Sequence, residues 1–440
     1  MKPIRSRAGI PTTRALPRTS AWPRTLALGA ALAAAAGCAG KARNDAATPA
    51  TPKVEEVEME PIKLQGVKGA DGVQHVVTYD ATELFEQGGA ALSEKRYDDA
   101  VSAYDHLLKE FPAETKYTKA ALYNEGLALQ GKRDFPAAIA KFQQLADGFA
   151  GTSDAKDAQF QIGASYAEMG NWPTSAAIFA QILERKDLTP DDKIEATARR
   201  GFAQFQLHDY DTAERTFSSV LWYFRSIEHE ERLQTDFYLG LARYHLGEIP
   251  HEHFRAVPLR LPEKQMAIDM EEKARLLLVA QRQYIETIKL GNPQWASASG
   301  YQIGSLYEEF YDAFMHAPIP PELLGEANQE KREVYYEELR KRIRILLEKA
   351  LKTHEQNLLM LERLGVQNEW RDKSKLAFAN LQKMLDPTFK FEFADPSAPA
   401  PAAAPAPPAP QAPDGRSTEQ PDRERKEKPR PGSGSDRQIL

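Results

Sequence analysis

In the middle of the chain, apolar positions recur with the period of an α-helix. In Ala138-Phe142-Leu145 and Ala213-Phe217-Val220 the apolar side chains stand three and four residues apart, which places them on one face of a helix. Such helices need a neighbour to cover that face, so the pattern predicts an all-α fold of packed helices rather than a β-sheet fold.

Four glycines mark a repeat within this helical pattern. Nine residues after each glycine stands an aromatic, twelve residues after it a small residue, and sixteen residues after it a second aromatic. The glycines are Gly88, Gly126, Gly163 and Gly201, and the first aromatics are Tyr97, Phe135, Trp172 and Tyr210. The small residues are Ala100, Ala138, Ser175 and Ala213. The second aromatics are Tyr104, Phe142, Phe179 and Phe217. We expect the glycine and the small residue to let two helices approach closely, and the aromatics to fill the space between successive helical hairpins.

The order glycine, aromatic, small residue, aromatic resembles the tetratricopeptide repeat (TPR), a helix-turn-helix unit of about 34 residues. The units here are longer, with spacings of 38, 37 and 38 residues, and Phe111-Pro112 closes one of them. In this they resemble the repeats of outer-membrane lipoproteins such as the BamD-like barrel-assembly proteins, and similar repeat lipoproteins occur in gliding-motility machinery. The resemblance covers about residues 80–225 and implies a TPR-like helical-hairpin solenoid.

In proteins of this kind the first helix of each hairpin lines a binding groove, so the resemblance also implies candidate partner-binding residues. These are first-helix side chains outside the packing pattern: Phe85, Tyr123, Gln130, Phe160, Glu168 and Phe202. The alternative, in which the aromatics among them only cover the core, stays open.

Beyond residue 225 the repeat becomes irregular. A fifth unit with Gly240 and Tyr244 is followed late by a second helix near Ala280 and Tyr284, and the intervening Gly247–Met270 contains three prolines, which predicts a loop with a short helix. A sixth unit with Gly304 and Tyr307 is split by Pro318, Pro320 and Pro321. One long charged helix over Tyr335–Leu364, ended by Gly365, and a final helix over Trp370–Leu385 are expected to cap the array.

The beginning of the chain has the layout of a secretory signal. Six basic residues and no acid precede Cys38, with an apolar run from Leu26 to Ala36 that is too short to span a bilayer. Ala35-Ala36-Gly37-Cys38 resembles the lipobox of bacterial lipoproteins, although alanine stands where leucine is commonest. The resemblance implies removal of residues 1–37 and a covalent lipid (palmitate and diacylglycerol) on Cys38, and Ala39 in place of aspartate implies outer-membrane sorting.

These signals divide the chain into six parts. We expect a signal peptide over 1–37, a lipidated flexible tether over 38–75, four TPR-like repeats over 76–225, two irregular repeats over 226–325, capping helices over 326–390, and a disordered Pro-rich tail over 391–440.

Composition and motifs exclude several classes of function. The net charge of −6 becomes more negative when the basic signal is removed, which disfavours nucleic acid as a partner. No phosphate-binding loop, zinc-peptidase motif or hydrolase serine elbow is present, so we expect no enzyme activity, no metal site and no cofactor besides the lipid. The best metal-like cluster, His251-Glu252-His253, is interpreted as a polar loop tip, the basic stretch Arg340–Lys349 as a solvated helix face, and Trp222, Tyr223 and Phe224 as core.

The leading hypothesis is a lipid-anchored, periplasm-facing scaffold at the outer membrane that binds other envelope proteins. It would serve barrel assembly, cell-envelope coordination or gliding motility. One alternative is an accessory lipoprotein whose two Pro-rich insertions form a glycan- or metal-binding pocket. Another is that the Pro-rich tail carries the function. Partner identity and oligomeric state are left open.

Overall fold

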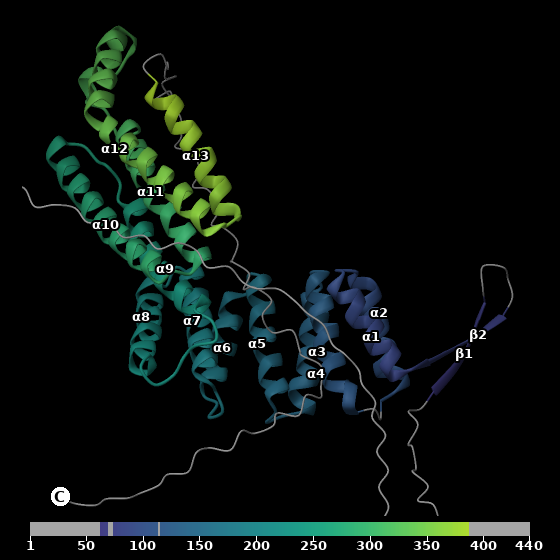
Figure 1. Cartoon of the computed structure of the whole chain (residues 1–440). Coiled ribbons are helices and arrows are strands. Elements are labelled where there is room, and N and C mark those ends of the chain that lie inside the picture. The colour runs from purple at the N-terminus through teal and green to yellow at the C-terminus, as the bar shows by residue number, and fades with distance from the viewer. Residues whose placement is uncertain (1–61, 69–73, 113–114, 387–440) are drawn as a thin grey trace, which may run out of the picture. The chain divides into compact units, whose positions relative to one another are not determined.

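The computed structural model describes residues 62–68, 74–112 and 115–386 (Figure 1). The expected signal peptide, Cys38, the first part of the tether and the Pro-rich tail lie outside the described residues. Within the described part, no helix combines the length and apolar character needed to cross a membrane.

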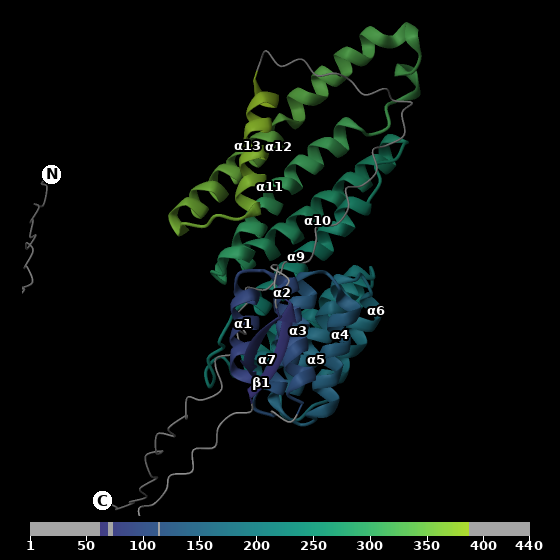
Figure 2. The same ribbon diagram turned by 90° about the vertical axis from the view of Figure 1, so that its right-hand side faces the viewer.

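The described residues form thirteen α-helices, each packed against the next in the chain (Figures 1 and 2). The all-α, TPR-like fold expected from the sequence is therefore confirmed. The first four hairpins are α1 (Ala81–Ser93) with α2 (Tyr97–Glu110), α3 (Thr115–Gly131) with α4 (Phe135–Gly148), α5 (Ser153–Glu168) with α6 (Trp172–Leu183), and α7 (Pro190–Gln206) with α8 (Tyr210–Ile227). The remaining helices are α9 (Phe237–Ala256), α10 (Glu263–Lys289), α11 (Pro293–Met315), α12 (Gln329–Leu364) and α13 (Glu369–Leu385).

The turn inside each early hairpin contains a left-handed residue, and in the second, third and fourth hairpins the next residue caps the second helix with its side chain, whereas Arg96 of the first hairpin makes no such bond. In the second hairpin Arg133 has a φ of 62°, and the Asp134 side chain accepts a hydrogen bond from the backbone N–H of Ala137. The third hairpin uses Gly170 and Asn171 in the same places. A cap of this type contributes about 1 kcal/mol, and it fixes where the second helix begins.

Each repeat glycine lies against the second aromatic of its own hairpin. A Cβ atom added at Gly126 would stand 2.5 Å from the Phe142 ring, and one added at Gly163 would stand 2.8 Å from the Phe179 ring. The same pairing joins Gly88 to Tyr104 and Gly201 to Phe217. We call these aromatics the wedge residues; they are fully buried, as are the small residues Ala100, Ala138, Ser175 and Ala213. Each wedge residue thus fills the space between the two helices of its own hairpin, as well as the space towards the next hairpin.

The fifth hairpin differs from the expectation. Helix α9 runs without a break through Pro250 to Ala256, so the loop expected from Gly247 to Met270 is wrong, and only residues 257–262 separate α9 from α10. Gly247, not Gly240, lies against the wedge Tyr284, whereas Gly240 lies against Trp295. Burial of Leu246, Ile249 and Phe254 on both sides of the proline stabilises the helix there, and packing overrides the helix-breaking tendency.

The sixth hairpin pairs α11 with α12. The break at Pro318, Pro320 and Pro321 is confirmed, and two 3₁₀ turns (η1, Pro321–Leu323; η2, Glu326–Asn328) occupy it. The end of α12 is also confirmed, because Gly365 adopts the left-handed conformation with a φ of 66°. Gly304 lies against His354 of α12, so α12 completes a hairpin instead of only capping the array, and α13 alone covers its end.

An antiparallel β-hairpin precedes α1. Strand β1 (Ile62–Lys68) pairs with β2 (Gln74–Asp80), with Leu64 opposite Thr78. The flexible tether predicted over 38–75 is therefore wrong for β1 and for the start of β2. The buried Tyr79 ring packs on His106 and Phe111, which holds β2 against the first helical hairpin.

Candidate partner-binding face

The first helices of the hairpins form a connected series. Contacts join α1 to α3, α3 to α5, α7 to α9 and α9 to α11. We call the exposed surface of α1, α3, α5, α7, α9 and α11 the first-helix face, and it is where the sequence analysis placed partner binding.

Three of the six expected groove residues are buried, which corrects their assignment. Tyr123 packs on the wedge Phe142 and Phe160 packs on the wedge Phe179, with ring centroids 5.6 and 6.1 Å apart. Both stand three residues before a repeat glycine, one helical turn away on the side that faces the wedge, so an aromatic there extends the core. Phe202 is enclosed between Trp172 and His245.

The other three expected residues reach the surface to different degrees. Phe85 is half-buried and packs on Tyr104. Gln130 is half-buried, and its side-chain amide donates to the Ser165 hydroxyl at 2.8 Å, which ties α3 to α5. Glu168 is exposed at the end of α5. Of the original six, only Glu168 is freely available to a partner.

Ion pairs connect neighbouring first helices in the early hairpins. The Lys119 ammonium donates to Asp154 at 2.7 Å, and the Lys156 ammonium donates to Asp192 at 2.5 Å. Both lysines stand seven residues before a repeat glycine, and both aspartates nine residues before the next one. This regular spacing of lysine and aspartate is visible in the sequence and is the signal by which the pairs could have been predicted.

The second of these pairs is buried and holds its charge. Burial alone would raise the pKa of the Asp192 carboxyl, but hydrogen bonds from Lys156 and from Thr189 outweigh burial, so that its pKa lies below the ordinary value. The ionised pair fixes α5 against α7.

In hairpins 5 and 6 the first helices carry charged and polar residues at three positions that are mostly uncharged in the earlier hairpins. The residues one, four and five positions after the repeat glycine are small, apolar or neutral in the first four hairpins, with Glu168 as their only charged member. The same positions hold Glu248, His251 and Glu252 in the fifth hairpin, and Ser305, Glu308 and Glu309 in the sixth.

These residues form a polar network around a fully buried histidine. His251 Nδ1 lies 3.0 Å from the Tyr284 hydroxyl, and its Nε2 lies 3.2 Å from Glu309 Oε2. The Tyr284 hydroxyl donates to Glu248, and Arg255 donates to both oxygens of Glu309, at 2.8 and 2.7 Å. We call these five residues the His251 network.

The neighbouring wedge position carries a second polar contact. His354, fully buried, replaces the aromatic wedge of the sixth hairpin, and its Nε2 lies 2.7 Å from Glu308 Oε1. In both hairpins, then, a polar wedge residue binds a carboxylate of the first helix: Tyr284 binds the buried Glu248, and His354 binds Glu308.

Contacts within the His251 network determine which of its groups are charged. Burial raises the pKa of Tyr284 far above its ordinary value, and the Glu248 carboxylate adds to that effect, so the phenol stays protonated. For Glu309, contacts from His251 and Arg255 outweigh burial and hold the pKa well below the ordinary value. Glu308 and Glu309 keep side-chain exposures of 30% and 28%, so carboxylates held in place by buried partners reach solvent here.

The histidine cluster considered from the sequence is split by the helix. His251 is fully buried, whereas His253 is exposed. Across residues 62–68, 74–112 and 115–386 there is no group of three or more His, Cys, Asp or Glu side chains arranged to hold a metal ion.

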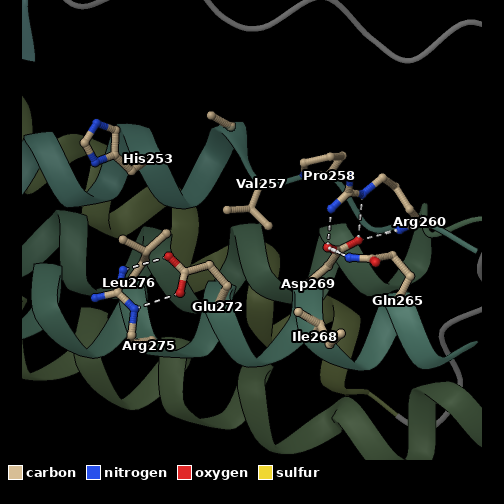
Figure 3. Close-up of a pocket in the computed structure, with 11 residues that line it drawn as sticks. His253, Val257, Pro258, Arg260, Gln265, Ile268, Asp269, Glu272, Arg275 and Leu276 are labelled. Atoms are coloured by element: carbon tan, nitrogen blue, oxygen red, sulfur yellow. Dashed lines mark hydrogen bonds and ion pairs between the residues drawn. The ribbon is translucent and has the colours of Figure 1, made fainter.

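A hollow of about 510 Å³ lies where α9 ends and α10 begins, at the first Pro-rich insertion (Figure 3). Its charged groups pair with each other: Arg260 with Asp269, and Arg275 with Glu272 (Figure 3). The apolar lining comes from Val257, Pro258, Ile268 and Leu276 (Figure 3). Because its charged groups are already paired, this hollow gives no specific support to a glycan or metal pocket.

The interpretation of Trp222 as a core residue is wrong. Its side chain is 72% exposed on α8, while Tyr223 and Phe224 are half-buried.

A comparison with protein families identifies one repeat of the chain. Residues 157–185, which include Gly163, Ser175 and Phe179, match the family described as Tetratricopeptide repeat. The fold is a tetratricopeptide-type repeat. A comparison with curated protein sequences finds no match.

A comparison with solved structures finds matches at low sequence identity. A tetratricopeptide repeat protein from Parabacteroides merdae shares 16% identity over 68% of this chain and 98% of its own, with a TM-score of 0.34. The apo form of RapI shares 12% over 69% of this chain and 99% of its own, with a TM-score of 0.37. PlcR from Bacillus thuringiensis, solved in complex with the peptide PapR7 and DNA, shares 15% over 45% of this chain and 70% of its own, with a TM-score of 0.30.

Proposed function

We propose that this protein is a lipid-anchored scaffold, periplasm-facing at the outer membrane, that binds other envelope proteins through its first-helix face. The observation that carries the proposal is the continuity of that face. Six hairpins stack with the same glycine and wedge contact, and ion pairs such as Lys156 with Asp192 fix successive first helices. A surface of this kind lets one extended ligand contact several hairpins at once.

The His251 network supports binding near hairpins 5 and 6. Buried partners hold Glu308 and Glu309 in fixed positions, so little side-chain freedom is lost when a partner contacts them. The anchor rests on the sequence around Cys38. Two or three acyl chains on that residue would hold the protein stably at a membrane, because each buried methylene contributes about 0.8 kcal/mol.

Radiolabelled palmitate tests the anchor. We expect the wild-type chain to incorporate the label and to fractionate with outer membranes, and Cys38→Ala to lose both, because no other residue of the chain carries a thiol. Ala39→Asp is the matched control: it should keep the label and move to the inner membrane in an enteric host. Wild-type protein without label would refute the anchor.

A further inference from the structure

Three aliphatic side chains of the β-hairpin are exposed instead of buried. Ile62, Leu64 and Val76 are 55%, 71% and 71% exposed. The register pairs Ile62 with Asp80, Leu64 with Thr78 and Gly66 with Val76, so the three aliphatics share one face of the ribbon. The residues on the other face hold the ribbon in place: Tyr79 packs on Phe111, and Lys63 lies 3.7 Å from Glu110.

A two-stranded ribbon with an uncovered apolar face is marginally stable in water. Strand β2 leads directly into α1 and contacts it, so β1 is the outer strand, and no other strand among the described residues pairs with it. A Cβ atom added at Gly66, in the middle of β1, would have no atom within 4 Å. The ribbon therefore has an unpaired strand edge at β1, an exposed apolar face, and unoccupied space above Gly66.

The sequence supplies a segment that complements this ribbon. The sequence of residues 388–394 is Thr-Phe-Lys-Phe-Glu-Phe-Ala. Polar and apolar positions alternate over 388–393, with Phe389, Phe391 and Phe393 on one side and Lys390 and Glu392 on the other. This is the pattern of a β-strand with one covered face. The segment is as long as β1 and β2, which have seven residues each.

We propose that residues 388–394 of one copy of the chain add to β1 of a second copy as a third strand. The phenylalanines then cover Ile62, Leu64 and Val76, and a phenyl ring lies over Gly66, as aromatics on adjacent strands do with glycines in other sheets. Backbone hydrogen bonds at the β1 edge provide affinity, and the alternating phenylalanines provide the register.

The connection explains why the acceptor is a second copy. Only Asp386 and Pro387 stand between the end of α13 and the segment, a reach of about 10 Å. Helix α13 packs on α11 and α12, at the end of the helical series, whereas the ribbon contacts α1 at its beginning. A head-to-tail contact between copies joins two such ends without moving a helix, and it can continue into longer assemblies.

Two half-defective variants, each with one of the two pairing surfaces disrupted, test the proposal. Both are full mature chains that also carry Cys38→Ser, which prevents acylation. One has a defective segment (Phe389→Ser, Phe391→Ser and Phe393→Ser); the other has a defective ribbon (Leu64→Lys and Val76→Lys). We expect the wild type to increase in mass with concentration in sedimentation velocity, and each variant alone to remain a monomer. An equimolar mixture of the two should double in mass and stop there, because only one intact junction exists.

A matched control, Lys390→Ser with Glu392→Ser, changes the polar side of the same segment and should associate like the wild type. Circular dichroism and the melting temperature of both half-defective variants should match the wild type, because the substituted ribbon side chains are exposed. A wild type that stays monomeric up to its highest soluble concentration would overturn the proposal. So would a mixture that behaves like its separate components.

Discussion

Replacing Gly126 with valine is expected to lower the free energy of unfolding by about 3 kcal/mol, which is the upper part of the usual range for overpacking a core. Even a Cβ atom at this position would stand 2.5 Å from the Phe142 ring, which is fully buried and cannot move aside. The added volume would push α3 away from α4 and spoil the stacking of neighbouring hairpins. Urea denaturation followed by circular dichroism at 222 nm measures the change.

Two comparisons make this result specific to the wedge. Gly148→Ala, at the exposed end of α4, places a Cβ atom where no other atom lies within 4 Å, and it should leave stability unchanged or raise it slightly. In a Phe142→Leu background, Gly126→Ala should cost less than in the wild type, because the smaller side chain leaves room. Equal costs in the two backgrounds would show that the glycine does not serve the wedge.

Replacing Glu309 with glutamine is expected to cost about 3 kcal/mol at pH 7, because the fully buried His251 and the guanidinium of Arg255 then face a neutral amide instead of a carboxylate. The cost should depend on pH. The folded-state pKa of Glu309 lies below its unfolded value, so its stabilising contribution is complete above the unfolded pKa near 4.5 and is lost as the pH falls towards the folded pKa. The difference between wild type and variant should therefore be constant from pH 7 to about 5 and shrink below 4.5.

Urea midpoints measured at a series of pH values give this difference directly. Glu338→Gln is the matched control: Glu338 pairs with Lys341 on the surface of α12, with 55% of its side chain exposed, and such pairs contribute less than about 1 kcal/mol. A Glu309→Gln cost that stays the same down to pH 3 would mean that the carboxylate charge does not hold the His251 network together.

The first four hairpins could be predicted from the sequence because their contacts are local. The glycine of each hairpin meets a wedge sixteen residues later, as Gly126 meets Phe142, and the turn between the two helices always has three residues. In the fifth hairpin the longer helices move the wedge to Tyr284, thirty-seven residues after Gly247, so a fixed spacing selected Gly240 instead. The end of α12 was predictable because Gly365 stops it by a local conformational preference.

The candidate binding residues were harder to predict, because exposure depends on contacts between repeats. Tyr123 and Phe160 break the most obvious packing pattern, yet they lie against their wedges and are buried. The His251 network was missed because its members come from α9, α10 and α11, and no short motif joins them. Aligning the sequence on Gly247 and Gly304 would have revealed it, since charged residues then appear at positions that are mostly uncharged in the earlier repeats.

Photo-crosslinking in living cells tests the partner-binding face most directly. A photoreactive amino acid would replace Glu168 or Glu252 on the first helices α5 and α9, and Gln144 or Ser219 on the second helices α4 and α8. We predict crosslinked protein adducts of the same mass from both first-helix positions and none from the second-helix positions. Adducts confined to Gln144 and Ser219 would contradict the account.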